Sequence, residues 1–157
     1  MVCLAATLVA VADELAPFPN FPFRNLDSGK VVTLDQLRGK PVLITFWASW
    51  CGPCRVELPE LQRLHEELGD KGFVLLAVNV DSSASAARRF LELHKLQIPV
   101  YRMDQRDLAA IGVSGIPTNL LLDRDGRPVQ LYEGYSPAVA GAIRDHVRSM
   151  LPADPGR

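Results

Sequence analysis

Two cysteines, Cys51 and Cys54, are the residues of this 157-residue sequence with the clearest capacity for chemistry. They form a C-x-x-C within the pentapeptide Trp50-Cys51-Gly52-Pro53-Cys54, which follows an apolar run and opens a helical pattern. At a helix start, unpaired backbone N–H groups and the positive end of the dipole favour the Cys51 thiolate, which is the attacking species. Cys54 lies one helical turn further and is close enough to resolve a mixed disulfide formed at Cys51.

The residues around the two sulfurs fit this use. Gly52 allows a close approach, and Pro53 suits the first helical turn, where its missing N–H costs nothing. A zinc site would need two further ligands, but Cys3 and the three histidines are scattered along the sequence. Covalent haem attachment would need a histidine directly after the second cysteine, and Arg55 stands there. The pentapeptide therefore predicts a dithiol–disulfide couple that uses neither a metal nor another cofactor.

The elements on both sides of the cysteine pair must position it. Residues 41–48 form the continuous apolar run PVLITFWA, which predicts a strand covered on both faces. From residue 54 to residue 68 leucines recur at helical spacing, and Gly69 ends the pattern. Residues 73–80, FVLLAVNV, predict a second buried strand. The cysteine pair therefore falls where a buried strand passes into a helix.

The remaining segments alternate between strand and helix patterns. A turn at Asp27-Ser28-Gly29 predicts an N-terminal β-hairpin, followed by a helical turn over 34–38. Further strands are expected over 99–102, 118–123 and 128–133, and further helices over 84–95 and 104–111. A last helix, ended by Pro152, has an inner face made of Val139, Ala142, Ile143, Val147 and Met150. This order predicts the α/β class, a mixed sheet with helices on both faces.

Composition limits the function classes. The length suits one domain that can bury a core, and no repeat or low-complexity run is present. With 17 basic and 18 acidic side chains the net charge is -1, which argues against a nucleic-acid binder because such a protein needs a basic face. Three cysteines are too few for a small protein scaffolded by disulfides.

The N-terminal segment is predicted to be a targeting segment rather than part of the domain. Residues 1–12 carry no charge, and as a helix they would extend only about 18 Å, too short to span a membrane. Ala10-Val11-Ala12 has the small-x-small form of a signal-peptidase site, although a basic start is missing. The alternative is a helix or strand packed on the domain. We expect residues 1–17 to be a signal-peptide or anchor remnant with a proline-rich linker, 18–152 the domain and 153–157 a tail.

Two motifs together resemble the thioredoxin superfamily. They are the run Phe46-Trp47-Ala48-Ser49-Trp50-Cys51-Gly52-Pro53-Cys54 and the loop Gly115-Ile116-Pro117-Thr118. Within the superfamily the chain is most similar to the TlpA/ResA/CcmG (DsbE) group of exported thiol–disulfide oxidoreductases. The resemblance covers about residue 18 to the C-terminus. It implies a thioredoxin-like fold, here with the N-terminal hairpin and a strand–helix insertion over about 81–107.

The resemblance also implies roles for the second motif. A cis bond between Ile116 and Pro117 would turn the Ile116 backbone toward an extended client segment. Together with Thr118, these residues are expected to contact the client. On the cysteine side the same contact is expected of Gly52 and Pro53, and of Trp50 at the rim, whereas Trp47 is expected in the core.

A departure from ordinary thioredoxins concerns the proton acceptor. Those proteins carry a buried aspartate six residues before the first cysteine, and Thr45 stands at that position here. The ResA-like group instead places a glutamate three residues after the second cysteine, and Glu57 matches it. One helical turn from Cys54, its carboxylate can take the proton when Cys54 attacks. The alternative is an ordinary first-turn glutamate stabilised by the helix dipole.

The resemblance implies a direction and partners as well. The Gly-Pro dipeptide is similar to that of thioredoxin, whose potential of about -270 mV is far more reducing than the about -120 mV of DsbA. We therefore expect a monomeric, exported reductant of client disulfides, periplasmic or membrane-anchored, with apocytochrome c as one candidate client. A membrane protein of the DsbD/CcdA type would re-reduce it. Alternatives are a redoxin-type thiol peroxidase and a redox-inert binding module.

Overall fold

The computed structural model describes residues 17–153, and the fold is built on one sheet of seven strands. The strands are β1 Pro22–Asn25, β2 Val31–Thr33, β3 Val42–Trp47, β4 Val74–Asn79, β5 Val100–Arg102, β6 Thr118–Leu122 and β7 Pro128–Glu133. Their order across the sheet is β2-β1-β5-β4-β3-β6-β7. β3, β4 and β5 run parallel, whereas β1, β2, β6 and β7 add antiparallel pairs at the two edges. The predicted mixed sheet is therefore confirmed.

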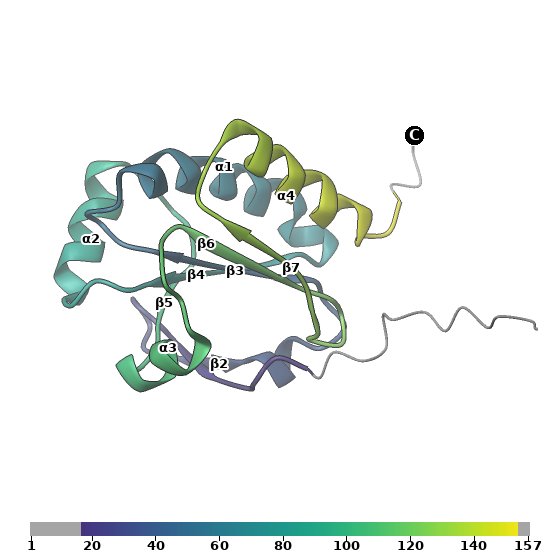
Figure 1. Ribbon diagram of the computed structural model, residues 1–157, viewed down its shortest axis with the longest axis horizontal. Helices are drawn as coiled ribbons and strands as arrows, with labels where there is room; N and C mark the ends of the chain where they lie inside the picture. Colours follow the sequence, from purple (N-terminus) through teal and green to yellow (C-terminus); the bar gives the residue numbers. More distant parts are fainter. Residues whose placement is uncertain (1–16, 154–157) are drawn as a thin grey trace, which may run out of the picture.

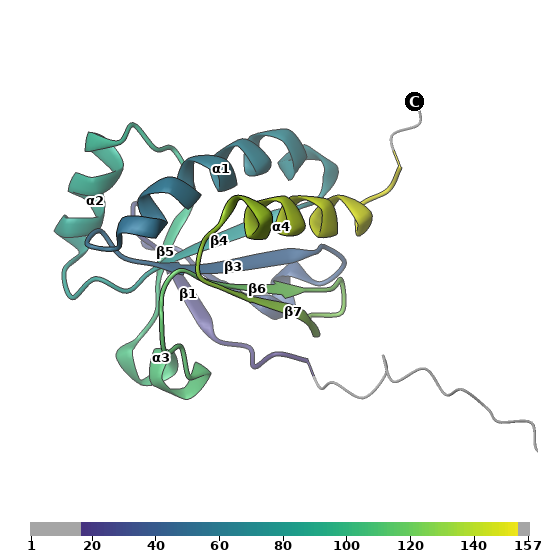
Figure 2. The same ribbon diagram turned by 45° about the horizontal axis from the view of Figure 1, so that its top comes forward.

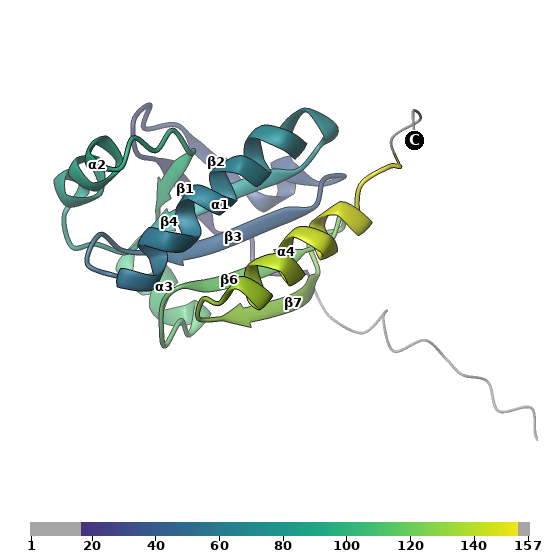
Figure 3. The same ribbon diagram turned by 90° about the horizontal axis from the view of Figure 1, so that it is seen from above.

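Helices cover both faces of the sheet (Figures 1 and 2). They are η2 Leu34–Leu37, α1 Gly52–Leu68, η3 Gly69–Lys71, α2 Ala84–Leu93, α3 Gln105–Ile111 and α4 Pro137–Ser149. Seen from above, α1 and α4 run side by side across one face (Figure 3). α2 packs into the same apolar core as α1 and α4, whereas η2 and α3 cover the opposite face.

The central strand β3 contacts both cores because all six of its residues are buried. Leu43 and Trp47 belong to the core under α1 and α4, whereas Val42, Ile44 and Phe46 belong to the other. This alternation is the period-2 geometry of a strand, and it explains why β3 is apolar at every position but Thr45. The burial of Trp47, as predicted, is complete.

α1 begins at Gly52 with Cys51 as its N-cap and Pro53 in its first turn, as expected from the sequence. Two other helix ends differ from the predictions. α2 ends at Leu93 rather than at Lys95, because Lys95 has a φ of 52°, in the left-handed region.

The second difference is in α4, which ends at Ser149, before Pro152. Beyond this end the backbone forms a tighter turn, in which the Met150 N–H donates to the Val147 carbonyl and the Leu151 N–H to the Arg148 carbonyl. Ala142 is exposed rather than on the inner face of this helix. The buried face follows the four-residue spacing of Val139, Ile143 and Val147, and Ala142 falls beside it.

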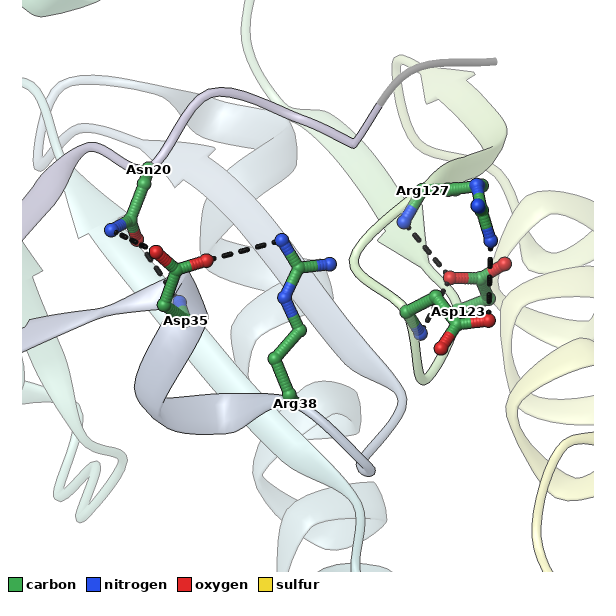
Figure 4. A network of polar contacts seen from close by, with 6 residues as sticks. Asn20, Asp35, Arg38, Asp123 and Arg127 are labelled. Carbon is green, nitrogen blue, oxygen red and sulfur yellow. Dashed lines mark hydrogen bonds and ion pairs between the residues drawn. The ribbon is translucent and has the colours of Figure 1, made fainter. Parts of the chain in front are cut away.

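The first described residues are fixed to the end of the sheet where β3 begins. Phe18 N–H donates to the Gly126 carbonyl at 2.8 Å, in the turn between β6 and β7. Asn20 bonds twice to Asp35, through its amide to the carboxylate and through its oxygen to the backbone N–H (Figure 4). Arg38 extends this group toward the turn. The chain therefore enters the domain at the end remote from the cysteine pair.

Most of the predicted targeting segment, with Cys3, lies outside the described residues. Among residues 17–153, no helix combines the length and the apolar character that crossing a membrane requires.

We predict that Leu58→Ala in α1 lowers the free energy of unfolding by about 2–5 kcal/mol, because the Leu58 side chain is fully buried and its loss leaves a cavity. Val56→Ala, two residues earlier and 53% exposed, should change it by less than about 0.5 kcal/mol. Urea unfolding of the oxidised proteins measures both values. Equal effects of the two substitutions would contradict the packing described for α1.

Candidate active site

Cys51 and Cys54 form a disulfide at the carboxyl end of β3, where the chain passes into α1. Their Cα atoms are 5.3 Å apart. The Cys54 N–H donates to the Cys51 sulfur at 3.2 Å, so Cys51 caps the helix with its own side chain. Cys51 retains 5% of its exposure, whereas Cys54 is fully buried. The helix N–H groups therefore point at the more accessible sulfur, where they would stabilise a thiolate after reduction.

A buried carboxylate fixes the loop that precedes Cys51. Asp81, 3% exposed, follows β4 and accepts hydrogen bonds from the Ser49 N–H at 2.9 Å and the Ser49 hydroxyl at 2.8 Å. The Asn79 amide donates to the same carboxylate at 2.7 Å. This network was missed in the sequence analysis. The signal in the sequence was Asn79 near the end of the apolar run 73–80 and Asp81 directly after it. This run ends at the same end of the sheet as β3, the strand that leads to the cysteines.

Glu57 lies in the interior on the sheet side of α1, with 1% of its surface exposed. The Asn119 amide donates to Glu57 Oε1 at 2.7 Å, and the Thr45 hydroxyl makes a long contact of 3.5 Å to Oε2. Thr45 and Asn119 are direct partners in the antiparallel register of β3 and β6. Glu57 is therefore a buried carboxyl group, unlike the ordinary first-turn glutamate that was the alternative in the sequence analysis. Thr45, at the position of the missing aspartate, contacts the Glu57 carboxyl group.

Burial sets the proton affinity of this carboxyl. Desolvation is the main cause that raises the pKa of Glu57, from its ordinary 4.5 to about 7, and the charge of Glu60 adds to it. The hydrogen bonds from Asn119 and Thr45 act in the opposite direction because they favour the ionised form. Glu57 follows Cys54 by three residues, so both buried side chains fall on the same side of α1, one helical turn apart.

The Gly115–Thr118 loop forms the other side of the site. The Ile116–Pro117 peptide bond is cis, as predicted, and Pro117 is buried. The Thr118 hydroxyl donates to the Gly115 carbonyl at 2.6 Å, so this side chain is used within the loop. Thr118 also pairs with Phe46 near the end of β3, which brings the loop beside the cysteine motif.

An open groove of about 570 Å³ runs between the loop and the motif. Trp50, 72% exposed, and Ile116 lie on it together with Val80, Leu108, Ala109, Val113, Ser114 and Gly115. Two other residues predicted to contact a client, Gly52 and Pro53, are exposed in the first turn of α1 but do not line the groove. The structure therefore brings Trp50 and Ile116 together beside the disulfide.

The parallel centre of the sheet, the capping cysteine and the cis-proline loop define a thioredoxin-like fold with a dithiol–disulfide site. Residues 15–147 match the AhpC/TSA family, and the chain belongs to that family.

Curated relatives carry the description thiol-disulfide oxidoreductase ResA. The protein from Bacillus thuringiensis (strain Al Hakam) is 34% identical over 71% of this chain and 65% of its own length. The one from Bacillus subtilis (strain 168) is 31% identical over 87% of this chain and 75% of its own length. The chain thus spans about 65% of the length of the Bacillus relatives at 34% identity.

A solved structure also relates the chain to thiol–disulfide exchange proteins. The crystal structure of a Chlorobium tepidum protein assigned as thiol:disulfide interchange protein DsbE superposes with a TM-score of 0.79 at 32% identity. It covers 88% of this chain and 97% of the other. The thioredoxin-like fold and the similarity to the TlpA/ResA/CcmG group, both expected from the sequence, are confirmed.

We predict that Glu57→Gln changes the pH dependence of folding. Between pH values of about 4.5 and 7, the folded protein keeps a proton on Glu57 that the unfolded chain has released, so the free energy of unfolding falls as pH rises through this window. Glutamine does not titrate. The stability of the variant relative to the wild type should therefore increase by about 3 kcal/mol across the window.

Urea unfolding of both oxidised proteins at several pH values measures this difference. All other titrating groups are common to the two proteins and cancel. Curves that stay parallel from acid to mildly alkaline pH would contradict the raised proton affinity of Glu57.

Proposed function

We propose that this protein is a thiol–disulfide oxidoreductase that reduces disulfides of client proteins through Cys51 and Cys54. The observation that carries the proposal is the asymmetry of the pair. Cys51 caps α1 and retains some exposure, whereas Cys54 is fully buried one turn before the protonatable Glu57. This arrangement assigns attack on the client to Cys51 and resolution to Cys54.

The first step transfers the client to the protein. In the reduced protein the Cys51 thiolate attacks one sulfur of a client disulfide, the client S–S bond breaks, and a mixed disulfide forms. The client's second sulfur leaves as a thiolate. The N–H groups of the first turn of α1 stabilise the attacking thiolate, because they carry the positive end of the helix dipole.

The second step releases the client. The Cys54 thiol gives its proton to the Glu57 carboxylate, and the resulting thiolate attacks the Cys51 sulfur. The mixed disulfide breaks, the client leaves with two reduced sulfurs, and the Cys51–Cys54 disulfide forms. Two electrons have passed from the protein to the client. With a pKa of about 7, Glu57 is ionised in a large fraction of molecules at neutral pH, as a base for this step must be.

The groove beside the disulfide supports an extended, partly apolar client segment. Trp50 and Ile116 form apolar contacts at its edge, and Leu108 and Val113 continue the apolar lining. An exposed tryptophan is an effective contact in such a surface because it buries a large area with few rotatable bonds. Thr118 and Pro117 are buried and shape the loop that carries Ile116.

We further infer that the domain over residues 18–152 acts as a monomer outside the cytoplasm. The leader-like composition of residues 1–12 and the similarity to an exported group support this placement. Since each turnover leaves the protein oxidised, a membrane electron donor of the DsbD/CcdA type would restore the dithiol. Apocytochrome c with an internal disulfide is one client of the required chemistry.

We predict that Cys54→Ser stops the reaction at the mixed disulfide. Mixing the reduced variant with oxidised insulin should give a covalent adduct at Cys51 that thiol reductant removes, seen by non-reducing electrophoresis and mass spectrometry. The wild type should instead reduce insulin, and Cys51→Ser should form no Cys51-linked adduct. Insulin left intact by the wild type would overturn the proposed function and favour a redox-inert module. Hydrogen peroxide consumption, assayed in parallel, tests the peroxidase alternative.

We predict that Trp50→Ala raises KM for insulin by about tenfold, because truncating an aromatic contact in an interface typically costs more than 1 kcal/mol. The rate with Ellman's reagent, a small disulfide, should change less than about twofold, since it does not fill the groove. Leu93→Ala is the matched control, an apolar residue of α2 that is 74% exposed and away from the groove. Equal losses with both substrates would contradict a role in client binding.

A further inference from the structure

We propose that Asn119 is a positioning residue that keeps the Glu57 carboxyl oriented beside Cys54 whether or not this carboxyl carries a proton. The inference rests on the proposed thiol–disulfide exchange. In that reaction Glu57 must accept a proton from Cys54 and later give it up, so both of its protonation states occur in every cycle.

The first support is the geometry around the carboxylate. Asn119 is fully buried, and its amide donates to Glu57 Oε1 at 2.7 Å, a short bond typical of a charged acceptor. Thr45 reaches the other oxygen at 3.5 Å only. Because Thr45 and Asn119 are register partners on β3 and β6, both side chains face α1 from the sheet. Asn119 is therefore the stronger of the two contacts that fix this carboxyl.

The second support is an unused acceptor. The Asn119 side-chain oxygen is buried and has no hydrogen-bond partner among the described residues. An asparagine amide carries a donor and an acceptor of nearly the same shape, exchanged by a half-turn of the amide. The ionised carboxylate needs the donor, and the protonated carboxyl needs the acceptor for its O–H. One residue can thus bond Glu57 in both states, which an apolar residue of equal size cannot.

The charged and titratable groups around Glu57 set the background for a pH effect. On the helix side of the sheet an open cavity of about 370 Å³ between α1 and α4 is lined by Glu57 itself together with Glu60, Arg63, Glu67, Arg144 and Arg148. Tyr135, just before α4, donates to Glu60 Oε1 at 2.9 Å. From the sheet Glu57 contacts the neutral Thr45 and Asn119, and on α1 the buried Cys54 lies one helical turn before it.

Loss of Asn119 removes the main opposition to proton binding at Glu57. Burial and the Glu60 charge raise the pKa of Glu57, whereas the Asn119 bond lowers it, because the bond to the ionised carboxylate is stronger than the bond to the neutral carboxyl. Without that bond Glu57 would ionise at higher pH, and fewer molecules would hold a base for Cys54 at neutral pH. A role confined to packing would instead alter stability without moving the pH at which the reaction accelerates.

The test follows the resolution step directly. Reduced protein mixed with excess Ellman's reagent releases one thiolate when Cys51 attacks and a second when Cys54 resolves the mixed disulfide. The first-order rate of the second phase should rise with pH as Glu57 ionises. In Asn119→Leu the inflection of this pH profile should move up by about one pH unit. Resolution should then be about tenfold slower than in the wild type at pH values below the wild-type inflection.

Two matched variants make the interpretation specific. Thr45→Val, which removes the longer contact from the partner strand, should shift the inflection less than Asn119→Leu does. In a Glu57→Gln background, Asn119→Leu should have no further effect on the second phase, because its action passes through Glu57. Asn119→Thr keeps a hydroxyl and should shift the inflection by an intermediate amount, and it provides the measurement if the leucine variant does not fold.

The outcomes separate the two proposals. A wild type that reduces insulin, with an Asn119→Leu or Asn119→Thr profile identical to its own, would overturn the positioning role and leave the function intact. The same fractional loss with and without Glu57 would also overturn it. A wild type that fails to reduce insulin and lacks the second phase would instead overturn the proposed function.

Discussion

Leu58 and Leu61 of α1 are buried with Leu43 of β3 and Leu121 of β6, and this packing determines where the helix begins along the sheet. Because α1 starts immediately after the loop that leaves β3, the same contact places Cys51 at the helix N-terminus and Cys54 beneath it. Glu57 is carried into the interior by the same helix, one turn further on. The packing of α1 on the sheet thus places all three reacting groups, and the hydrogen bonds of Asp81 and Asn119 then fix the loop before Cys51 and the Glu57 carboxyl.

This packing also explains why polar residues occur in so apolar an interior. A carboxyl group buried by α1 would be costly without hydrogen-bond donors, and Thr45 and Asn119 supply them from two neighbouring strands. Asp81 accepts two bonds from Ser49, which fix the loop before Cys51, and a third from Asn79. The site therefore combines a sulfur that retains slight exposure with two buried carboxyl groups that are held by hydrogen bonds.

Much of this structure could be predicted from local patterns. The apolar run of β3, the leucine spacing of α1 and the two motifs were sufficient for the fold, the cysteine pair and the cis proline. The bond between Asn119 and Glu57 joins residues 62 positions apart and depends on the register of β3 against β6, which no local pattern encodes. The contact of Asp81 with Ser49, 32 positions apart, was missed for the same reason. The early end of α2 reflects a single backbone angle at Lys95.

The chain enters the domain beside the β6–β7 turn, so its entry point and the disulfide lie at opposite ends of the sheet. Phe18 and Asn20 are bonded at the end of the sheet where β3 begins, with Asn20 shown in Figure 4, and the disulfide lies at the end where β3 passes into α1. Any attachment made through the residues before Phe18 would hold the domain at the end of the sheet opposite the disulfide. The groove and the exposed edge of Trp50 would then point away from the point of attachment, toward whatever approaches from the surroundings.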